Sequence, residues 1–345
     1  MTLWSLVDVR GLDAMMRGER SLSERPVVTV LVPLEDDLLD QIRVECDVRQ
    51  LDYTTPRDEL RASLGDVDGV LVSPRIPADK AFFDAATSLR VLSSHSVGYD
   101  PFDIPEATAH GVVVCNTPGV LTAAVANVTM ALIFNLTLRL FDNERFVRNG
   151  GWARREQAPP LGHDVQGKTL GVVGFGRIGQ EVTRRMQALG MKTLWYDVFD
   201  TPHPDAPESS YCPLDDLLAE SDFVSLHTNL DASSCHLIGE AELAKMKPTA
   251  YLINTARGGL VDQKALTFAL QNDVIAGAGL DVLEREPPEE DDPVYTLQNV
   301  ICFPHIGTAT EETRRMMREL AVENLLAVLR GDRPPACVNP EVLDT

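Results

Sequence analysis

The sequence predicts an α/β fold that consists of two doubly wound parallel-sheet domains. Short apolar runs, such as "DGVLVSP" at 68–74 and "GVVVCNTPG" at 111–119, alternate with helical patterns along most of the chain. Strands separated by helices are typical of parallel sheets that carry helices on both faces. The chain has 345 residues, which exceeds what one ordinary hydrophobic core accommodates, so two domains are expected.

The first series of strands occupies the N-terminal third of the chain. A helical pattern, "EDDLLDQIRVE", follows the first strand, and helical apolar spacing runs later from about Leu121 to Phe146. Residues 1–25 precede the first strand and are interpreted as an N-terminal extension. The expected strands of this series lie at 27–34, 68–74, 90–98 and 111–119.

The second series begins near Lys168. Its expected strands lie near 169–173, 192–197, 222–226, 250–254, 274–280 and 299–303. A last long helix is expected from about Thr310 to Leu329, and the tail "GDRPPACVNPEVLDT" is interpreted as a strap. The simplest arrangement places a domain of residues 121–307 inside a domain of residues 1–120 and 308–345.

The composition is that of an acidic protein. The formal net charge is −21, and such a surface repels phosphate backbones, so nucleic acid is not an expected partner. No segment is long and apolar enough to span a bilayer, and the N-terminus lacks a signal-peptide core. The six cysteines include no CxxC pair, which favours a reducing compartment. We therefore expect a cytoplasmic protein without a membrane partner and without a metal site.

Residues 174–179, "GFGRIG", match the pattern G-x-G-x-x-G. They follow the strand "TLGVV" and open the helix "RIGQEVTRRMQALG". Gly174 permits a tight turn, Gly176 lets the backbone approach a pyrophosphate, and Gly179 lets the helix pack on the strand. The free N–H groups at the start of the helix then hold the phosphates. The pattern predicts a dinucleotide site; a glycine turn that only joins strand to helix is the alternative.

The next strand, "KTLWYDVFD", contains the residue that bears on coenzyme choice. Asp197 lies about 20 residues after the glycine motif, where an acidic residue binds ribose hydroxyls. A carboxylate there repels the additional phosphate of NADP. The next residues are Val198 and Phe199, so no arginine follows to receive that phosphate. NAD(H) is therefore favoured over NADP(H).

Three polar residues follow strands of the second series: Arg257 in "LINTARGGLVD", Glu286 in "AGLDVLEREP" and His305 in "CFPHIG". A guanidinium grips a carboxylate in a bidentate fork, and a histidine gives and takes a proton near neutral pH. A carboxylate beside the ring holds one tautomer and favours its charged form. Together they predict reduction of a 2-oxo acid, in which hydride goes to the carbonyl carbon and His305 protonates the oxygen. A salt bridge or a turn is the alternative for each residue alone.

With these motifs the chain resembles the D-2-hydroxyacid dehydrogenase family over nearly its whole length after about residue 25. The resemblance rests on "GVVGFGRIGQ", "LINTARGGLVD", "GLDVLEREP" and "FPHIGTATEETR". It implies a Rossmann NAD-binding domain, residues 121–307, inserted into a flavodoxin-like substrate domain, residues 1–120 and 308–345. Within the family the chain is most similar to glyoxylate/hydroxypyruvate reductases, including those that act on 2-ketogluconate. The family also implies a homodimer.

The resemblance implies a role for individual residues. Arg257 would bind the substrate, and Glu286, rather than Glu284, would partner His305, the acid/base. The backbone N–H groups of Val97 and Gly98, in "SVGYD", would hold the substrate carboxylate. Thr255 and Ala256 would line the nicotinamide ring, and Asp281 would bond its carboxamide. The full set of residues expected to bind the cofactor is Gly174, Gly176, Arg177, Ile178, Gly179, Asp197, Thr228, Thr255, Ala256, Asp281, His305 and Gly307.

Two alternative functions stay open from the sequence. Corepressors that resemble the C-terminal binding proteins share the fold, the NAD site and the Arg–Glu–His set, but they act by binding peptides. A phosphoglycerate dehydrogenase should show a basic cluster near "VSPRIP", where only Arg75 occurs; Arg75 is included among the expected substrate-binding residues. The segment 121–150 is apolar on more than one face, which agrees with a homodimer.

Overall fold

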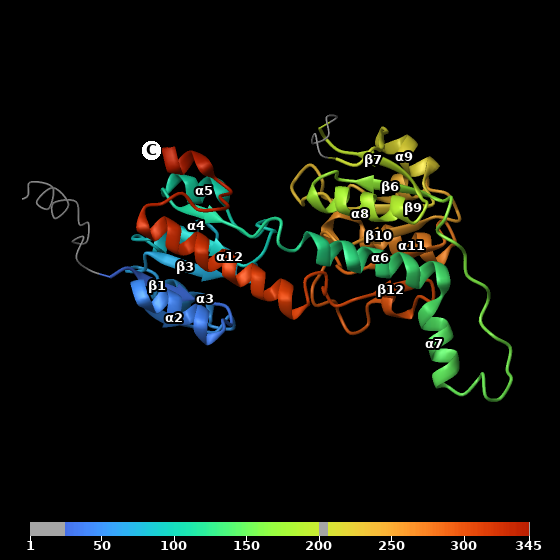
Figure 1. Ribbon diagram of the computed structural model, residues 1–345, viewed down its shortest axis with the longest axis horizontal. Coiled ribbons are helices and arrows are strands. Elements are labelled where there is room, and N and C mark those ends of the chain that lie inside the picture. Colours follow the sequence, from blue (N-terminus) through green and yellow to red (C-terminus); the bar gives the residue numbers. More distant parts are fainter. Residues whose placement is uncertain (1–24, 200–205, 345) are drawn as a thin grey trace, which may run out of the picture. The chain divides into compact units, whose positions relative to one another are not determined.

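The computed structural model describes residues 25–199 and 206–344 (Figure 1). The chain forms two compact units: the first takes in Met1–Thr117 and Arg318–Thr345, and the second takes in Pro118–Met317. The second unit is therefore inserted, along the chain, between the two parts of the first. The expected N-terminal extension lies outside the described residues up to residue 24.

The first unit contains a parallel sheet of five strands in the order β2-β1-β3-β4-β5. This is the flavodoxin-like order of doubly wound sheets, so the predicted fold of this part is confirmed. The sequence does not predict β2, because its residues "DVRQ" are mostly exposed at the sheet edge and show no apolar pattern. The strands are β1 (Val27–Val30), β2 (Asp47–Gln50), β3 (Gly69–Val72), β4 (Val91–Ser94) and β5 (Val113–Cys115).

Helices cover both faces of this sheet. On one face, α2 and the C-terminal half of α12 pack against Val28 and Val30. On the other face, α3, α4 and α5 pack near Val70 and Val72. Adjacent strand residues point to opposite faces, and both faces are buried, so the strands are apolar along their length. The helices are α2 (Asp36–Glu45), α3 (Arg57–Ala62), α4 (Lys80–Ala85), α5 (Ile104–Ala109) and α12 (Glu311–Arg330).

The second unit contains a parallel sheet of seven strands in the order β12-β11-β10-β9-β6-β7-β8. The chain leaves β6 toward β7 on one side and later returns to β9 on the other, which makes β6/β9 the switch point where doubly wound sheets bind ligands. The Rossmann prediction for this part is therefore confirmed. The strands are β6 (Thr169–Val173), β7 (Lys192–Tyr196), β8 (Ser210–Tyr211), β9 (Phe223–Leu226), β10 (Tyr251–Asn254), β11 (Gly277–Leu280) and β12 (Val300–Cys302).

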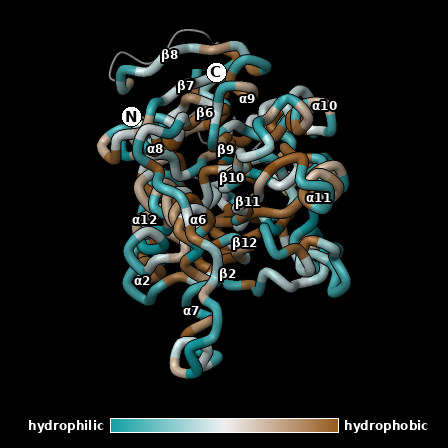
Figure 2. Tube along the Cα trace, turned by 90° about the vertical axis from the view of Figure 1, so that its right-hand side faces the viewer, coloured by the Kyte–Doolittle hydropathy of each residue, from teal (hydrophilic) through white to brown (hydrophobic). Residues whose placement is uncertain are grey.

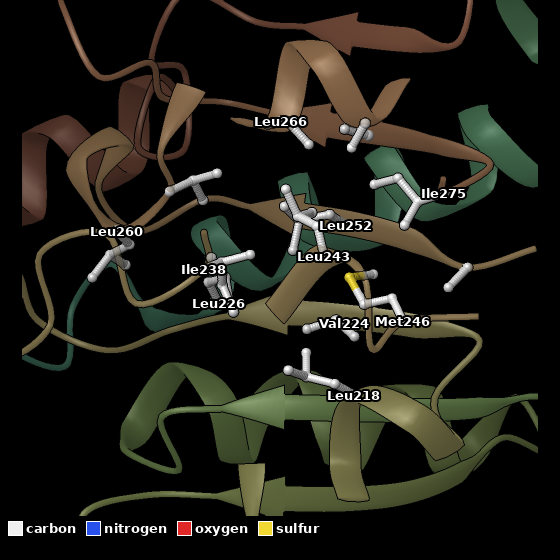
Figure 3. Close-up of a cluster of buried hydrophobic side chains, with 14 of the residues drawn as sticks. Leu218, Val224, Leu226, Ile238, Leu243, Met246, Leu252, Leu260, Leu266 and Ile275 are labelled. Atoms are coloured by element: carbon white, nitrogen blue, oxygen red, sulfur yellow. The ribbon is translucent and has the colours of Figure 1, made fainter. Parts of the chain in front are cut away.

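Two apolar layers hold this sheet between helices. One layer, shown in Figure 3, joins the sheet to α9, α10 and α11 through residues such as Leu218, Leu243 and Leu266. The other joins it to α6 and α8. Figure 2 shows hydrophobic colour gathered along β9 to β12. The helices are α6 (Thr122–Leu138), α8 (Arg177–Ala188), α9 (Leu214–Glu220), α10 (Glu240–Leu243) and α11 (Gln263–Gln271).

The helical pattern expected from about Leu121 to Phe146 is interrupted in the structure. Arg139 has a left-handed φ of 53°, which ends α6, and α7 (Leu140–Arg148) continues after a bend of 65°. In Figures 1 and 2, α7 projects away from the sheet, and none of its residues is buried. A single continuous helix is therefore wrong, because α6 covers the sheet while α7 leaves it.

Within the described residues no single helix has the length and apolarity needed to cross a membrane. Taken together, the bent pair α6 and α7 has the length and the composition of a membrane-spanning segment.

Candidate active site

The glycine motif forms the turn between β6 and α8. Gly174 has a φ of 93°, and a Cβ there would lie 2.6 Å from backbone atoms of His227 and Thr228. A Cβ on Gly179 would lie 2.2 Å from the Gly174 carbonyl oxygen, so only glycine lets α8 approach the turn. A Cβ on Gly176 would meet nothing within 4 Å, which leaves open space at the start of α8. This geometry fits the pyrophosphate of a dinucleotide.

Asp197 follows β7 beside the same turn. Its Oδ2 accepts the backbone N–H of Phe175 at 2.7 Å, so the carboxylate lies next to the start of α8. Arg177 is exposed in the first turn of α8, and Ile178 beside it is half-buried. A dinucleotide held by this turn would therefore bring its ribose toward a carboxylate.

A second histidine, His227, lies beside the glycine turn but stays uncharged at neutral pH. Its Nε2 lies 2.8 Å from Ser225 Oγ. Loss of hydration on burial lowers the pKa of His227 to about 3, so the ring is neutral at any working pH. Thr228 follows at the carboxyl end of β9 and is half-buried.

Arg257 follows β10 in a turn that a buried asparagine holds in place. Nδ2 of Asn254 donates to the Arg257 carbonyl at 2.8 Å, and its Oδ1 accepts the N–H of Ala256 at 3.0 Å. The Arg257 guanidinium donates to the Ala256 carbonyl at 2.8 Å and is half-buried. Thr255 is buried, with its Oγ1 2.9 Å from Thr129 Oγ1 of α6. The backbone that carries the guanidinium is therefore fixed.

His305 and Glu286 form a hydrogen-bonded pair. Nδ1 of His305 donates to Glu286 Oε2 at 2.7 Å, which leaves Nε2 for proton exchange. Burial raises the pKa of Glu286, but the hydrogen bond and charge of His305, the N–H of Leu283 and the charge of Arg257 outweigh it and hold that pKa below its usual value. The carboxylate is therefore ionised at neutral pH and selects the tautomer with a proton on Nδ1.

Asp281 fixes the turn that carries His305. Its buried carboxylate accepts the N–H of Ile306 on Oδ1 and the N–H of Gly307 on Oδ2, each at 2.7 Å. Its backbone carbonyl accepts the N–H of His305 at 2.9 Å, and His305 adopts a left-handed φ of 55°. Burial raises the pKa of Asp281 despite these donors. The position of His305 after Pro304 thus depends on a carboxylate at the end of the neighbouring strand, β11.

Glu284, two residues before Glu286, pairs with a different histidine. Its Oε1 lies 3.0 Å from His236 Nε2, and its Oε2 accepts the N–H of Gln263 at 3.2 Å. The two glutamates of "LEREP" therefore turn to different partners. Glu284 ties the loop to the start of α11, and Glu286 stays with His305.

The remaining substrate candidates belong to the first unit. Val97 and Gly98 follow β4 and are half-buried; within the described part of the chain, their N–H groups donate to no other group. Two consecutive N–H groups of this kind can receive an anion such as a carboxylate. Arg75 is exposed after β3, and its guanidinium lies 5.8 Å from the centre of the Tyr53 ring.

Asn254 and His227 are not among the site residues predicted from the sequence. Each stands at the carboxyl end of a buried strand, Asn254 as the last residue of "YLIN" and His227 directly after "FVSL". A polar residue that ends an apolar run is the signal that could have found them. In residues 25–199 and 206–344, no group of three or more His, Cys, Asp or Glu side chains is placed to hold a metal ion.

Comparison with known protein families gives a match over the second unit. The family model for the D-isomer specific 2-hydroxyacid dehydrogenase, NAD binding domain, matches residues 130–307. The chain is 43% identical over 325 residues to a glyoxylate reductase from Thermofilum pendens, and the match covers 92% of this chain and 96% of the relative. It is also 43% identical over 328 residues to a glyoxylate reductase from Thermococcus gammatolerans, with 92% and 97% covered.

Solved structures with the same fold include two reductases. A glyoxylate reductase from Paecilomyes thermophila superposes with a TM-score of 0.84 at 31% identity and covers 92% of this chain and 99% of its own. An NADPH-dependent glyoxylate/hydroxypyruvate reductase from Sinorhizobium meliloti, solved with NADP and malonate, gives 0.81 at 32% identity, with 91% and 98% covered. The chain therefore belongs to the D-isomer specific 2-hydroxyacid dehydrogenase family, and it is an oxidoreductase that uses a nicotinamide dinucleotide to reduce a small 2-oxo acid.

Proposed function

We propose that this enzyme reduces a 2-oxo acid of the glyoxylate, hydroxypyruvate or 2-ketogluconate class to the D-2-hydroxy acid, with NADH as coenzyme and His305 as the acid/base. The nicotinamide, when bound, supplies the hydride. The observation that carries the proposal is the 2.7 Å hydrogen bond from His305 Nδ1 to Glu286 Oε2. It places a proton-carrying ring, with Nε2 available, in the unit that contains the dinucleotide turn.

In the proposed reaction, Nε2 of the protonated His305 ring gives a proton to the carbonyl oxygen as the carbonyl carbon is reduced. The ionised Glu286 stabilises the imidazolium before this transfer and keeps the ring in one orientation. In the oxidation of a 2-hydroxy acid, the neutral ring takes the proton back at the same atom. His227 does not compete, because its ring remains neutral.

The proposed grip on the substrate carboxylate has two parts. Arg257 offers a guanidinium that can bind a carboxylate with two hydrogen bonds. Asn254 holds the Arg257 backbone in place, which limits where the guanidinium can lie. Val97 and Gly98 offer two consecutive N–H groups at the end of β4. The Arg75 side chain, which we also count among the substrate contacts, is exposed after β3.

NADH is proposed over NADPH because of Asp197. A carboxylate beside the glycine turn accepts hydrogen bonds from ribose hydroxyls and repels an additional phosphate. The Sinorhizobium relative uses NADPH, so the preference of this chain has to be measured directly. The remaining cofactor contacts that we propose are those of the glycine turn, Thr228, Thr255, Ala256, Asp281 and Gly307.

Purified enzyme assayed with NADH and with NADPH on glyoxylate, hydroxypyruvate and 2-ketogluconate should show the higher kcat/KM with NADH. Asp197→Ala should narrow the ratio between the coenzymes by about tenfold or more, because a hydrogen bond to a charged group contributes about 1.5–3 kcal/mol and 1.4 kcal/mol is tenfold. Asp215→Ala is the control, since Asp215 is an exposed acid paired with Lys245 on another face. A wild-type preference for NADPH would refute the coenzyme assignment, and absence of turnover on all three acids would refute the substrate class.

We also propose that the chain forms a homodimer through α7 and the residues that follow it. The segment that leaves the sheet with α7 returns to α6, where the N–H of His163 donates to the Thr137 carbonyl at 2.8 Å. Large apolar side chains are exposed along it. A surface of this kind on a protein of net charge −21 is better covered by protein than by nucleic acid. The exposed residues are Leu138, Leu140, Phe141, Val147, Trp152 and Leu161.

Light scattering at micromolar concentration should give a mass near twice the 37.9 kDa of one chain. Phe141→Asp should lower the mass toward that of a monomer, because a carboxylate in an apolar interface must be desolvated. Val44→Asp, which changes an exposed valine of α2 in the first unit, should leave the mass unchanged. A wild-type mass of one chain would contradict the proposal.

The two alternative functions are not favoured. The curated relatives named above are glyoxylate reductases that align over more than nine-tenths of this chain. A phosphate site would need a basic cluster in "VSPRIP", where Arg75 is the one basic residue of the sequence.

A further inference from the structure

The Val97–Gly98 peptide has a fixed orientation in the first unit. The carbonyl oxygen of Val97 accepts a hydrogen bond of 2.8 Å from Nδ2 of Asn116. A carbonyl oxygen only accepts, so the side-chain atom that faces it must be the amide nitrogen. Because a trans peptide is planar, the Val97 carbonyl and the Gly98 N–H point in opposite directions. The bond from Asn116 therefore turns the Gly98 N–H away from Asn116.

Asn116 is itself held rigidly. It directly follows β5 and is 9% exposed. Its backbone carbonyl accepts a hydrogen bond of 3.0 Å from Nδ2 of Asn324, a fully buried residue of α12. Oδ1 of Asn324 in turn accepts the N–H of Ala336 at 2.9 Å, which connects α12 to the C-terminal strap. Two buried carboxamides thus form a chain of hydrogen bonds from the strap to the turn after β4.

The next peptide adds a second tie to the same turn. The N–H of Thr117 donates to the Ser96 carbonyl at 3.0 Å, one residue before Val97. The carbonyls of Ser96 and Val97 are therefore both paired with the segment after β5. The N–H groups of Val97 and Gly98 donate to no other group in the described residues, although both residues are half-buried. Such N–H groups are available to pair with a ligand or with water.

We propose that Asn116 is a positioning residue for the reaction: it orients the Val97–Gly98 peptide so that its N–H receives the substrate carboxylate, and Asn324 holds Asn116 from behind. This inference rests on the proposed function, in which these N–H groups bind the carboxylate. It adds that the carboxylate grip in the first unit depends on a buried amide that does not touch the substrate. Asn254 has the corresponding contacts to the backbone of Arg257 in the second unit.

The test measures steady-state kinetics of Asn116→Ala and of the nearly isosteric Asn116→Asp, whose carboxylate cannot donate to the Val97 carbonyl. We expect KM for hydroxypyruvate to rise about tenfold or more, with a smaller change in kcat and an unchanged Kd for NADH. Asn324→Ala should raise KM by a smaller factor. The effects of Asn116→Ala and Asn324→Ala should be less than additive, because both residues act on one peptide.

Asn339→Ala is the matched control. Asn339 is even more buried in the same unit, 1% exposed against 9% for Asn116, and it bonds the N–H of Val114, the Val112 carbonyl and Thr108; within the described residues it makes no hydrogen bond to the Val97 turn. Its loss should lower the Tm at least as much as the loss of Asn116 while leaving KM unchanged. An equal rise of KM in Asn339→Ala would reduce Asn116 to a general structural role and overturn the proposal.

A comparison of glyoxylate with its methyl ester tests the carboxylate grip and the positioning role of Asn116 separately. The wild-type enzyme should prefer the acid in kcat/KM, and both Asn116 variants should lose about tenfold or more of that preference. A wild-type enzyme without the preference would refute the carboxylate grip in the proposed function. A wild-type preference that both Asn116 variants and Asn324→Ala retain within about threefold would overturn the positioning role alone.

Discussion

His305→Gln should reduce hydroxypyruvate on the order of 10²-fold or more slowly than the wild-type enzyme, because a lost acid/base group removes about 10²–10⁴ of rate. NADH binding should change little, although His305 is in the expected cofactor set, because the glycine turn and Asp197, which are expected to hold the rest of the dinucleotide, lie on other strands. Glutamine retains a polar side chain of similar reach but cannot release a proton from Nε2. The measurement is kcat with saturating NADH, together with the Kd of NADH from fluorescence titration.

His236→Gln is the control for this result. His236 is also exposed in the second unit and also pairs with a glutamate, at 3.0 Å. It should retain kcat within a small factor. Turnover by His305→Gln near the wild-type rate would remove His305 from the chemistry, and a matching loss in His236→Gln would show that the assay reports on stability rather than on proton transfer.

Glu286→Gln should lower kcat for reduction by about tenfold, because the amide carries no charge to stabilise the imidazolium that gives up its proton. A hydrogen bond to a charged group contributes about 1.5–3 kcal/mol, and the low end applies because both side chains are partly exposed, 49% for His305 and 39% for Glu286. Glutamine can still accept the Nδ1 hydrogen bond, so the ring orientation survives. The loss should therefore be smaller than that of His305→Gln.

The pH dependence of the pair comes from Glu286. Burial raises the pKa of Glu286, but the hydrogen bond and charge of His305 help to hold that pKa below its usual value, so the carboxylate is ionised at neutral pH and loses its charge only as pH falls through the lowered pKa. The difference in kcat between the wild type and Glu286→Gln should therefore be full at neutral pH and shrink at acid pH. Equal kcat for the two enzymes at neutral pH would contradict the pairing. Glu284→Gln, which changes the partner of His236, should leave kcat unchanged.

Much of the fold follows from local pattern. The apolar runs that match β1, β3 and β6 are strands because both faces of a parallel sheet are buried, which makes such strands uniformly apolar. The apolar pattern does not predict β2, because its residues "DVRQ" pair at an exposed edge and are mostly polar. It also does not predict the end of α6 at Arg139, because the apolar spacing continues across this residue, which only the folded chain holds at φ 53°.

The sequence by itself determined the doubly wound fold class, the position of the glycine motif and the chemical types at the strand ends, because period, turn residues and spacing are local properties of the chain. The tertiary structure decided which groups meet. The family resemblance names Glu286 as the partner of His305, but the two glutamates of "LEREP" are alike in local pattern, and the folded chain brings Glu286 to His305 and Glu284 to His236. The role we propose for Asn116 likewise depends on contacts with Val97 and Asn324, which lie 19 and 208 positions away along the chain. Such pairings are set by packing over long sequence distances, and no local pattern of residues encodes them.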